Sequence, residues 1–258
     1  MLISIEGNIG SGKSTFCNYL KDHFSKYYNR PHGVNILFVD EPVEDWVSIK
    51  DSSGDNILER FYKNPEKYAF CFQMTAYISR LANLKKAIKK CNEGDIIITE
   101  RSVFSDYNVF AKMLYDTGKI NQIEYQCYRM WFKNFLEDLP YTFYVYIKTD
   151  FNNCYNRVLN RGRKGETPIT KEYLESCGVY HDEWLSKERH ILTFDGNKDT
   201  NSHHEYVDVL KQMINYNTNF PTKFIGRMYY ESKYEKEKWN KRLYNRTLDQ
   251  CKKRLKKD

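Results

Sequence analysis

The most chemically specific residues in the chain form the segment Gly7-Asn8-Ile9-Gly10-Ser11-Gly12-Lys13-Ser14, followed by Thr15. Gly-x-x-x-x-Gly-Lys-Ser between a short apolar run and a helical pattern is typical of a phosphate-binding loop. Glycines let the backbone fold around an anion, and the N–H groups at the helix start point toward it. Lys13 is expected to reach the β- and γ-phosphates, and Ser14 to place a hydroxyl on Mg²⁺. The alternative is a glycine-rich turn with a chance lysine. The segment predicts a nucleoside triphosphate site.

Two carboxylates and an arginine stand where predicted strands end. Glu41 follows the apolar run 34–39, and Glu100 and Arg101 follow the β-branched run 96–99. Ligands of parallel sheets gather beyond the carboxyl ends of the strands, so these groups are expected near the phosphate loop. Phosphoryl transfer needs charge neutralisation and a group that takes the acceptor's proton. One acid could be that base and the other a metal-side ligand, whereas a solvated loop carboxylate is the alternative for either alone.

The elements that must position these residues alternate between strand and helix. This alternation predicts an α/β fold in which a five-stranded parallel sheet carries helices on both faces. Residues 51–55 are expected to form a flexible polar connection. The predicted strands are 2–6, 34–39, 96–99, 142–147 and 190–194, and the predicted helices are 13–28, 65–91, 102–116, 122–138, 151–160, 170–188 and 203–215.

Composition separates a near-neutral body from a basic tail. The 258 residues carry a net charge of +7, and residues 223–258 hold thirteen Lys/Arg against five Asp/Glu. Hydrophobic spacing predicts an amphipathic helix at 236–255, which could dock on the body, bind an acidic partner or touch nucleic acid.

No apolar run approaches the ~20 residues that span a bilayer. The seven scattered cysteines favour a reducing compartment, and we expect a cytoplasmic protein without a targeting segment.

Several blocks in order resemble a known family. They are Glu6 to Ser14, Glu41-Pro42-Val43, Phe72-Gln73, Glu100 to Asp106, and Leu159-Asn160-Arg161-Gly162-Arg163. Together they are similar to the cellular deoxynucleoside kinases, the group of deoxycytidine, deoxyguanosine and mitochondrial-type thymidine kinases. The resemblance covers about residues 1–215. It implies a P-loop kinase fold, ATP and Mg²⁺ as cofactors, a deoxynucleoside acceptor and a homodimer. Residues 216–258 have no counterpart in the family pattern, and their charge and hydrophobic spacing predict a basic, helical C-terminal extension.

The resemblance also implies catalytic roles. Glu41 matches the general base for the sugar 5′-hydroxyl, Arg101 the residue that steadies it, and Glu100 the carboxylate on the Mg²⁺ side. Trp46 and Phe110 match aromatic walls around the base, and ordinary core packing is the alternative for each.

Gln73 and Arg80 are seven residues apart, which places them on one helix face about 10 Å apart along the axis. An amide has both a donor and an acceptor for a nucleobase edge, and Phe72 precedes it in the matched block. A buried arginine needs a partner, and the family supplies one in Asp106. This pair resembles the deoxycytidine and deoxyguanosine kinases rather than thymidine-preferring members. It favours deoxycytidine or a purine deoxynucleoside, and the alternative is a surface salt bridge.

The remaining matches concern the sugar and the donor. Tyr62 and Glu166 match the residues that hold the sugar 3′-hydroxyl. The matched lid arginines, whose planar donors suit a triphosphate, are Arg157, Arg161 and Arg163. Asp195 opens a segment that resembles the loop around the donor base. Two positions depart from the family pattern: Tyr107 stands where many relatives have arginine, and Gly165 replaces an acidic residue.

Two other functions compete with deoxynucleoside phosphorylation. One is a nucleoside monophosphate kinase of the thymidylate kinase type, whose charged acceptor would need additional cationic contacts. The other is a nucleic-acid-binding protein that keeps an inactive kinase body, an alternative suggested by the basic tail.

Overall fold

Five parallel strands form one sheet in the order β2-β3-β1-β4-β5. The computed structural model describes residues 1–27, 35–136, 139–163, 165–166 and 168–218. The strands are β1 (Leu2–Glu6), β2 (Ile36–Val39), β3 (Ile96–Glu100), β4 (Thr142–Lys148) and β5 (Ile191–Asp195). The predicted α/β fold with a five-stranded parallel sheet is confirmed. From β1 the chain runs out to β2 at one edge, returns to β3 beside β1, and then crosses to β4 and β5 on the other side. The connections that follow the central strands therefore leave in opposite directions, and a ligand site is expected at their carboxyl ends.

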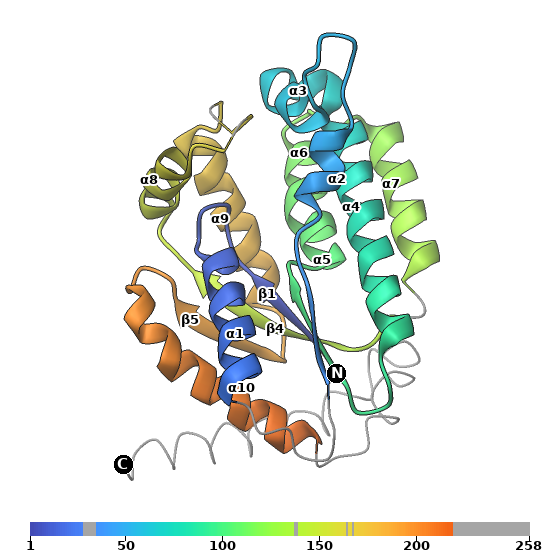
Figure 1. Ribbon diagram of the computed structural model, residues 1–258. Helices are drawn as coiled ribbons and strands as arrows, with labels where there is room; N and C mark the ends of the chain where they lie inside the picture. Colours follow the sequence, from blue (N-terminus) through green and yellow to red (C-terminus); the bar gives the residue numbers. More distant parts are fainter. Residues whose placement is uncertain (28–34, 137–138, 164, 167, 219–258) are drawn as a thin grey trace.

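Helices cover both faces of this sheet (Figure 1). Helices α1 (Lys13–Tyr27) and α10 (His203–Thr218) pack on one face, against Ile3 and Ile5 of β1 among others. Helices α4 (Pro65–Lys90) and α9 (Lys171–Leu185) cover the other face, with Leu2 packed under α4. Helix α7 (Gln122–Phe135) lies outside α4. All five residues of β1 are buried, with Ile3 and Ile5 in one apolar layer and Leu2 in the other, so the start of the phosphate-binding loop is held between the two layers.

Two short helices occupy a stretch where the sequence predicted none. They are α2 (Val43–Ser48) and α3 (Ile57–Lys63), and they sit above the carboxyl edge of the sheet (Figure 1). Asn56 and Glu59 form a capping box that begins α3, and this Asn-x-x-Glu pattern was readable in the sequence. The predicted polar connection at 51–55 joins the two helices.

The predicted helix at 102–116 is helical throughout but not uniform. It consists of α5 (Val103–Ser105), the π-helix η2 (Asp106–Ala111) and α6 (Lys112–Asp116). Hydrophobic spacing does not distinguish a π segment from an α-helix over so short a stretch, and such segments often occur at functional sites. Here it carries Asp106 and Phe110, both of which line the cavity described below.

Two further elements complete the description: α8 (Phe151–Arg161), which ends at Gly162, and the 3₁₀ turn η3 (Thr200–Ser202). The predicted tail helix at 236–255 lies outside the described residues. Within the described ranges, no helix is long and apolar enough to cross a membrane.

Candidate active site

A cavity of about 600 Å³ lies between the phosphate-binding loop and helices α2, α3 and α4. It is lined by residues from widely separated parts of the chain, from Ile9 to Tyr173. Those predicted from the sequence are Ile9, Gly10, Gly12, Lys13, Ser14, Thr15, Glu41, Trp46, Tyr62, Phe72, Gln73, Arg80, Glu100, Arg101, Asp106, Phe110, Arg157, Arg161, Arg163 and Glu166. Most of the predicted site residues therefore share one space.

The loop from Gly7 to Ser14 connects β1 directly to α1. Gly10 has a φ of +77°, and a Cβ there would lie 2.4 Å from the carbonyl oxygen of Cys154, so only glycine fits. Lys13 is buried, and its Nζ donates to the carbonyl oxygen of Asn8 at 2.6 Å. Burial lowers the pKa of Lys13 to about 8, assisted by nearby Arg101. The nearby charges of Glu100 and Glu41 favour the ammonium form, and an incoming phosphate would stabilise it further.

Gly7, Asn8 and Ser11 support the loop from behind and do not line the cavity. The amide Nδ2 of Asn8 donates to the carbonyl oxygen of Leu174 at 2.7 Å, which ties the loop to α9. The carbonyl oxygen of Ser11 accepts hydrogen bonds from Thr149 at 2.9 Å and from Arg157 at 3.2 Å. Arg157 thus already stands beside the phosphate-binding loop.

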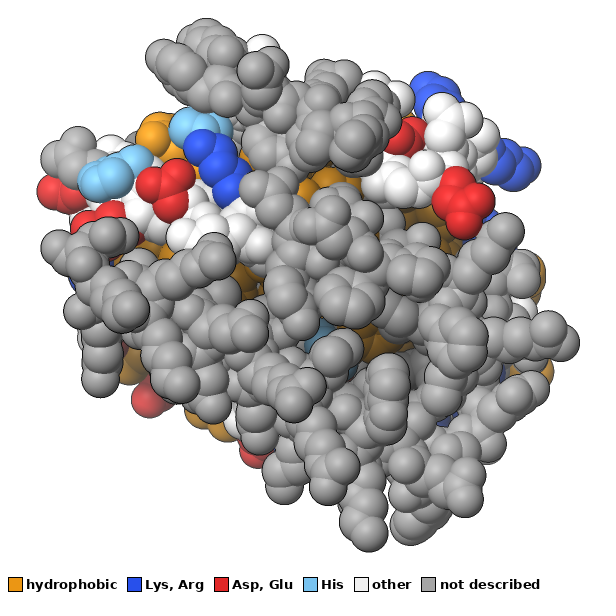
Figure 2. Space-filling model, turned by 90° about the horizontal axis from the view of Figure 1, so that it is seen from below, with side chains coloured by type: hydrophobic (Ala, Val, Ile, Leu, Met, Phe, Trp, Pro, Cys, Tyr) orange, Lys and Arg blue, Asp and Glu red, His pale blue; other side chains and the backbone are white. Residues whose placement is uncertain are grey.

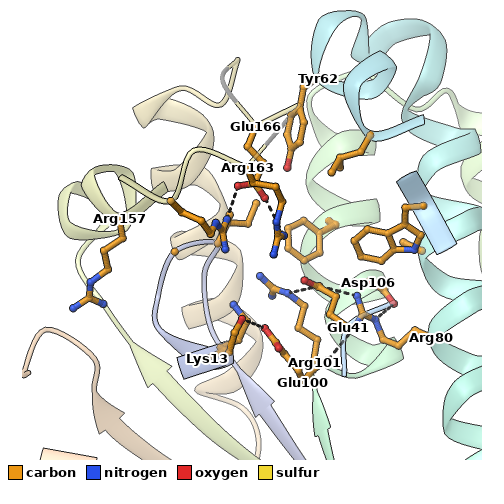
Figure 3. A pocket seen from close by; sticks show the side chains of 18 of the residues that line it. Lys13, Glu41, Tyr62, Arg80, Glu100, Arg101, Asp106, Arg157, Arg163 and Glu166 are labelled. Carbon is orange, nitrogen blue, oxygen red and sulfur yellow. Dashed lines mark hydrogen bonds and ion pairs between the residues drawn. The ribbon is translucent and has the colours of Figure 1, made fainter. Parts of the chain in front are cut away.

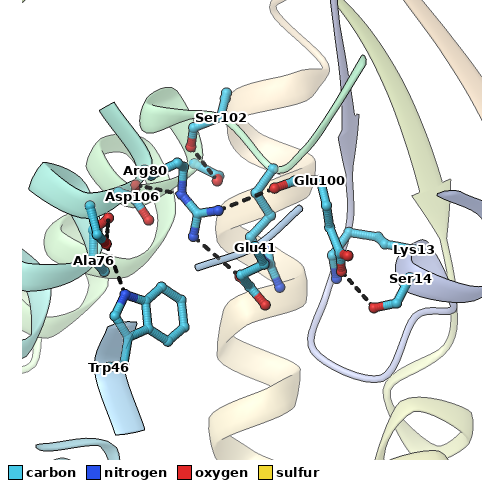
Figure 4. Close-up of polar contacts among 12 residues, drawn as sticks. Lys13, Ser14, Glu41, Trp46, Ala76, Arg80, Glu100, Ser102 and Asp106 are labelled. Atoms are coloured by element: carbon cyan, nitrogen blue, oxygen red, sulfur yellow. Dashed lines mark hydrogen bonds and ion pairs between the residues drawn. The ribbon is translucent and has the colours of Figure 1, made fainter. Parts of the chain in front are cut away.

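The two residues predicted to hold a metal ion touch each other. The hydroxyl of Ser14 donates to Oε1 of Glu100 at 2.6 Å, at the edge of the cavity (Figure 4). A hydroxyl oxygen and a carboxylate oxygen are the donors that Mg²⁺ prefers, and Mg²⁺ commonly takes few protein ligands, with phosphate and water oxygens completing its shell. The donor set therefore fits Mg²⁺.

Glu41 is held between two arginines. Its Oε1 lies 3.2 Å from the guanidinium of Arg80 and 3.2 Å from Nε of Arg101. Burial alone would raise the pKa of Glu41, but the two arginines outweigh it and bring this pKa to about 2. The carboxylate is therefore charged throughout the physiological pH range.

Arg80 connects three groups from different elements (Figure 4). It contacts Oδ2 of Asp106 at 2.9 Å, the carbonyl oxygen of Glu100 at 3.1 Å, and Glu41. The side chains of Arg80 and Asp106 are both buried, so this pair is not the surface salt bridge that was the alternative. Burial raises the pKa of Asp106 to about 6 against the attraction of Arg80.

Aromatic rings and one amide line the part of the cavity near Arg80. The rings of Trp46 and Phe72 meet edge to face at 5.4 Å, and the indole N–H of Trp46 donates to the hydroxyl of Ser79 at 2.9 Å. Gln73 is buried, and its Oε1 has no hydrogen-bond partner among the described residues. A buried acceptor without a partner is costly, so Gln73 is poised for a ligand that donates.

Glu166 joins the lid arginines to the cavity (Figure 3). Its two oxygens lie 2.5 Å from Arg161 and 3.2 Å from Arg163. Tyr62 extends from α3 toward the same space, and burial raises the pKa of its phenol, with the charge of Glu166 adding to the shift. The lid segment and α3 therefore meet above the cavity.

Some lining residues were not predicted from the sequence. They are Leu58, Ala76, Asn160 and Tyr173. Ala76 could have been found, because it lies three residues after Gln73 and four before Arg80 on one helix face. Leu58 and Tyr173 come from α3 and α9, and no local pattern indicated that these helices meet here. Asp195 does not line the cavity; its carboxylate accepts from the backbone and side-chain amides of Asn197.

The profile of the deoxynucleoside kinase family matches residues 3–218. The chain belongs to the deoxynucleoside kinase family. A fowlpox virus protein named "Probable deoxycytidine kinase" is 39% identical over 188 residues, which are 72% of this kinase and 72% of its own length. Mouse deoxycytidine kinase is 34% identical over 236 residues, 82% of this kinase and 90% of its own length. The mitochondrial deoxyguanosine kinase of Xenopus laevis is 29% identical over 214 residues, covering 76% and 77% of the two chains. This family member is an ATP-dependent enzyme, and its preferred acceptor is a separate question.

Proposed function

We propose that this kinase transfers the γ-phosphoryl group of ATP to the 5′-hydroxyl of deoxycytidine or a purine deoxynucleoside. One observation carries the proposal. A single cavity has the phosphate-binding loop at one end, the Arg80 and Asp106 side chains at the other, and the Glu41 carboxylate between them (Figure 3). Gln73 also lines this cavity. Donor and acceptor would therefore meet at Glu41.

Glu41 acts as the base in this proposal. The 5′-oxygen forms a bond to the γ-phosphorus while the bond to the bridging oxygen breaks, and ADP leaves with that electron pair. The hydroxyl proton passes to a Glu41 oxygen. A carboxylate with a pKa of about 2 is a weak base for a free alcohol. It suffices because the transition state is loose and the alcohol becomes acidic only as the new P–O bond forms.

The charges around the transferring group come from several elements. Lys13 binds the β- and γ-phosphates, and Arg101 orients Glu41 and the reacting oxygen. Ser14 and Glu100 would hold Mg²⁺, which when bound neutralises phosphate charge. Arg157, Arg161 and Arg163 close on the triphosphate with planar donor arrays. Within the Asp195 segment, the contacts of Asn197 with Asp150 at 3.0 Å and Asn153 at 2.9 Å support a preformed loop for the donor base.

The acceptor base is chosen by amide and carboxylate groups. Oε1 of Gln73 and the carboxylate of Asp106 both accept hydrogen bonds, and an exocyclic amino group is the donor that matches two acceptors. Cytosine, adenine and guanine have such a group, whereas thymine does not. Trp46, Phe72 and Phe110 supply flat faces for the base, and Tyr62 and Glu166 bracket the sugar 3′-hydroxyl.

Initial rates test the proposal. The full chain with ATP and Mg²⁺ is given each deoxynucleoside and, separately, each deoxynucleoside monophosphate, and the products are identified by chromatography. The expected products are deoxynucleoside 5′-monophosphates. Turnover of monophosphates alone would identify a nucleoside monophosphate kinase. Absence of all turnover, with salt-dependent nucleic-acid binding that needs residues 223–258, would identify the nucleic-acid-binding alternative.

We also propose a homodimer. Apolar side chains are exposed along α7, where Met130, Trp131 and Phe135 are 55%, 42% and 40% accessible, and Ile78 of α4 is 48% accessible. Trp131 and Phe135 stack at 5.4 Å. An apolar face of this kind on neighbouring helices is suited to a second copy of the chain.

The basic character of the tail is not shared by the described part of the lower face, where acidic and basic side chains are mixed (Figure 2).

A further inference from the structure

Arg101 has a strained backbone and a guanidinium with partners on several sides. Its φ of +62° is the only positive value at a non-glycine position in the described ranges. This conformation is sterically unfavourable for an L-residue, so the surroundings must hold it. Nε faces Glu41 at 3.2 Å, and the guanidinium carbon lies 4.9 Å from the centre of the Phe110 ring. A further contact is made by His181 of α9, whose Nε2 lies 3.3 Å from NH1 of Arg101.

The hydrogen bonds define the tautomer of His181. Its Nδ1 lies 2.6 Å from the carbonyl oxygen of Cys177. A carbonyl oxygen only accepts, so Nδ1 carries the proton and Nε2 presents a lone pair to Arg101. Burial lowers the pKa of His181 well below its usual value, and the charge of Arg101 adds to this shift. The neutral ring is thus an acceptor for a cation.

The ring of His181 is fixed by packing. His181 is fully buried and stacks on Tyr146 of β4, with ring centres 6.2 Å apart and an interplanar angle of 6°. Its other neighbour is Phe110, at 6.0 Å and 85°. Since β4 pairs with β1, the histidine is anchored to the sheet that carries the phosphate-binding loop. Rotation of the ring would break the stack and both hydrogen bonds.

We propose that His181 is a positioning residue that holds the Arg101 guanidinium toward Glu41 and the transferring phosphoryl group. The proposal rests on the proposed function, because it assigns Arg101 a role in that reaction. Without the Nε2 acceptor, Arg101 keeps its charge but loses its orientation. Misplaced charge affects the transition state more than substrate binding.

The test compares two substitutions in the full chain. His181→Phe keeps a flat ring against Tyr146 and removes the acceptor, whereas His181→Gln offers an amide oxygen near the position of Nε2. We expect the Phe variant to lower kcat about 10-fold with KM for both substrates little changed, since a hydrogen bond to a charged group is lost. The Gln variant should recover much of that loss. Equal kcat in wild type and the Phe variant would overturn the proposal.

Two further measurements separate positioning from packing. In an Arg101→Ala background, His181→Phe should have little further effect on kcat, whereas the same fold-loss in both backgrounds would contradict the proposal. NMR of the full chain with ¹⁵N-labelled histidine, assigned with the Gln variant, should show a neutral His181 protonated at Nδ1. An imidazolium at neutral pH would also overturn it. If the wild-type chain phosphorylates no deoxynucleoside, the proposed function fails, and the tautomer measurement still tests the contact.

Discussion

Glu41 shows how much of the chemistry depends on a single residue's surroundings. The sequence indicated a carboxylate at a strand end, and the arginines that hold its pKa at about 2 come from α4 and from the end of β3. Arg80 was predicted to pair with Asp106 alone. Its contact with Glu41 could not be predicted, because it depends on how α4 crosses the sheet edge. Through Arg80 the structure links Asp106, which we propose to read the nucleobase, to Glu41, the proposed general base.

Replacing Glu41 by Gln should lower kcat by ~10²-fold or more, since the amide cannot take the hydroxyl proton. Steady-state rates with saturating ATP and deoxynucleoside measure this. Glu44→Gln, on the exposed side of α2, is the matched control and should turn over normally. Near-normal kcat in Glu41→Gln would remove Glu41 from the base role.

The lowered pKa of Lys13 predicts that the enzyme takes up a proton when ATP binds at alkaline pH. In the empty enzyme this pKa is about 8, and bound phosphate stabilises the charged form and raises it. Above pH 8 the empty enzyme therefore lacks this proton and must take it up when ATP binds. The uptake should grow as the pH rises through this pKa. Calorimetry in two buffers of different ionisation enthalpy measures it, and binding without proton uptake would contradict the lowered pKa.

At the scale of elements, hydrophobic spacing in the sequence predicted the long and regular helices and strands. The strands and the 26-residue helix α4 have clear hydrophobic spacing, so they were found within a few residues of their ends. Helix α2, with six residues, was not predicted, because a short element obtains its stability from packing rather than from its own spacing. At η2 the predicted helix was present, but its π geometry was not predicted. These are the elements that bring Trp46, Asp106 and Phe110 to the cavity. The family resemblance identified these residues in the sequence, whereas the geometry of the short elements that carry them is visible only in the structure.

The contact between the lid and α3 depends on Gly165. Its φ is +92°, and a Cβ would lie 2.8 Å from Cγ of Glu59 in α3. Gly165→Ala should therefore raise KM for the deoxynucleoside, because Tyr62 and Glu166 lose their relative placement. Gly118→Ala is the matched control, with a φ of +73° and open space around the new methyl group. Both variants should lose about 1–2 kcal/mol of stability from strain, measured by thermal unfolding. Equal KM values in the two variants would show that the close approach is unimportant.

At the scale of the molecule, the exposed apolar face of α7 predicts self-association. The molar mass of the wild-type protein, measured by light scattering as it elutes from a size-exclusion column, should be twice the 31.0 kDa of one chain. Trp131→Glu should yield monomers, because a charge would be buried without a partner. Val179→Glu is the control, since Val179 is also half exposed but lies on α9. A monomeric wild type, or a dimer unaffected by Trp131→Glu, would exclude this face.

We propose that one cavity binds both the phosphate donor and an acceptor chosen by Arg80 and Asp106. The most direct test is the ratio of kcat/KM for deoxycytidine to that for thymidine in wild type and in an Arg80→Met/Asp106→Ala variant. Lys112→Met/Asp116→Ala, which removes an exposed ion pair, is the control. We predict a ratio above one in wild type and control that falls at least ~10-fold in the site variant, the discrimination expected when a buried polar pair is lost. A ratio unchanged by the site substitutions would contradict the role of Arg80 and Asp106 in choosing the acceptor.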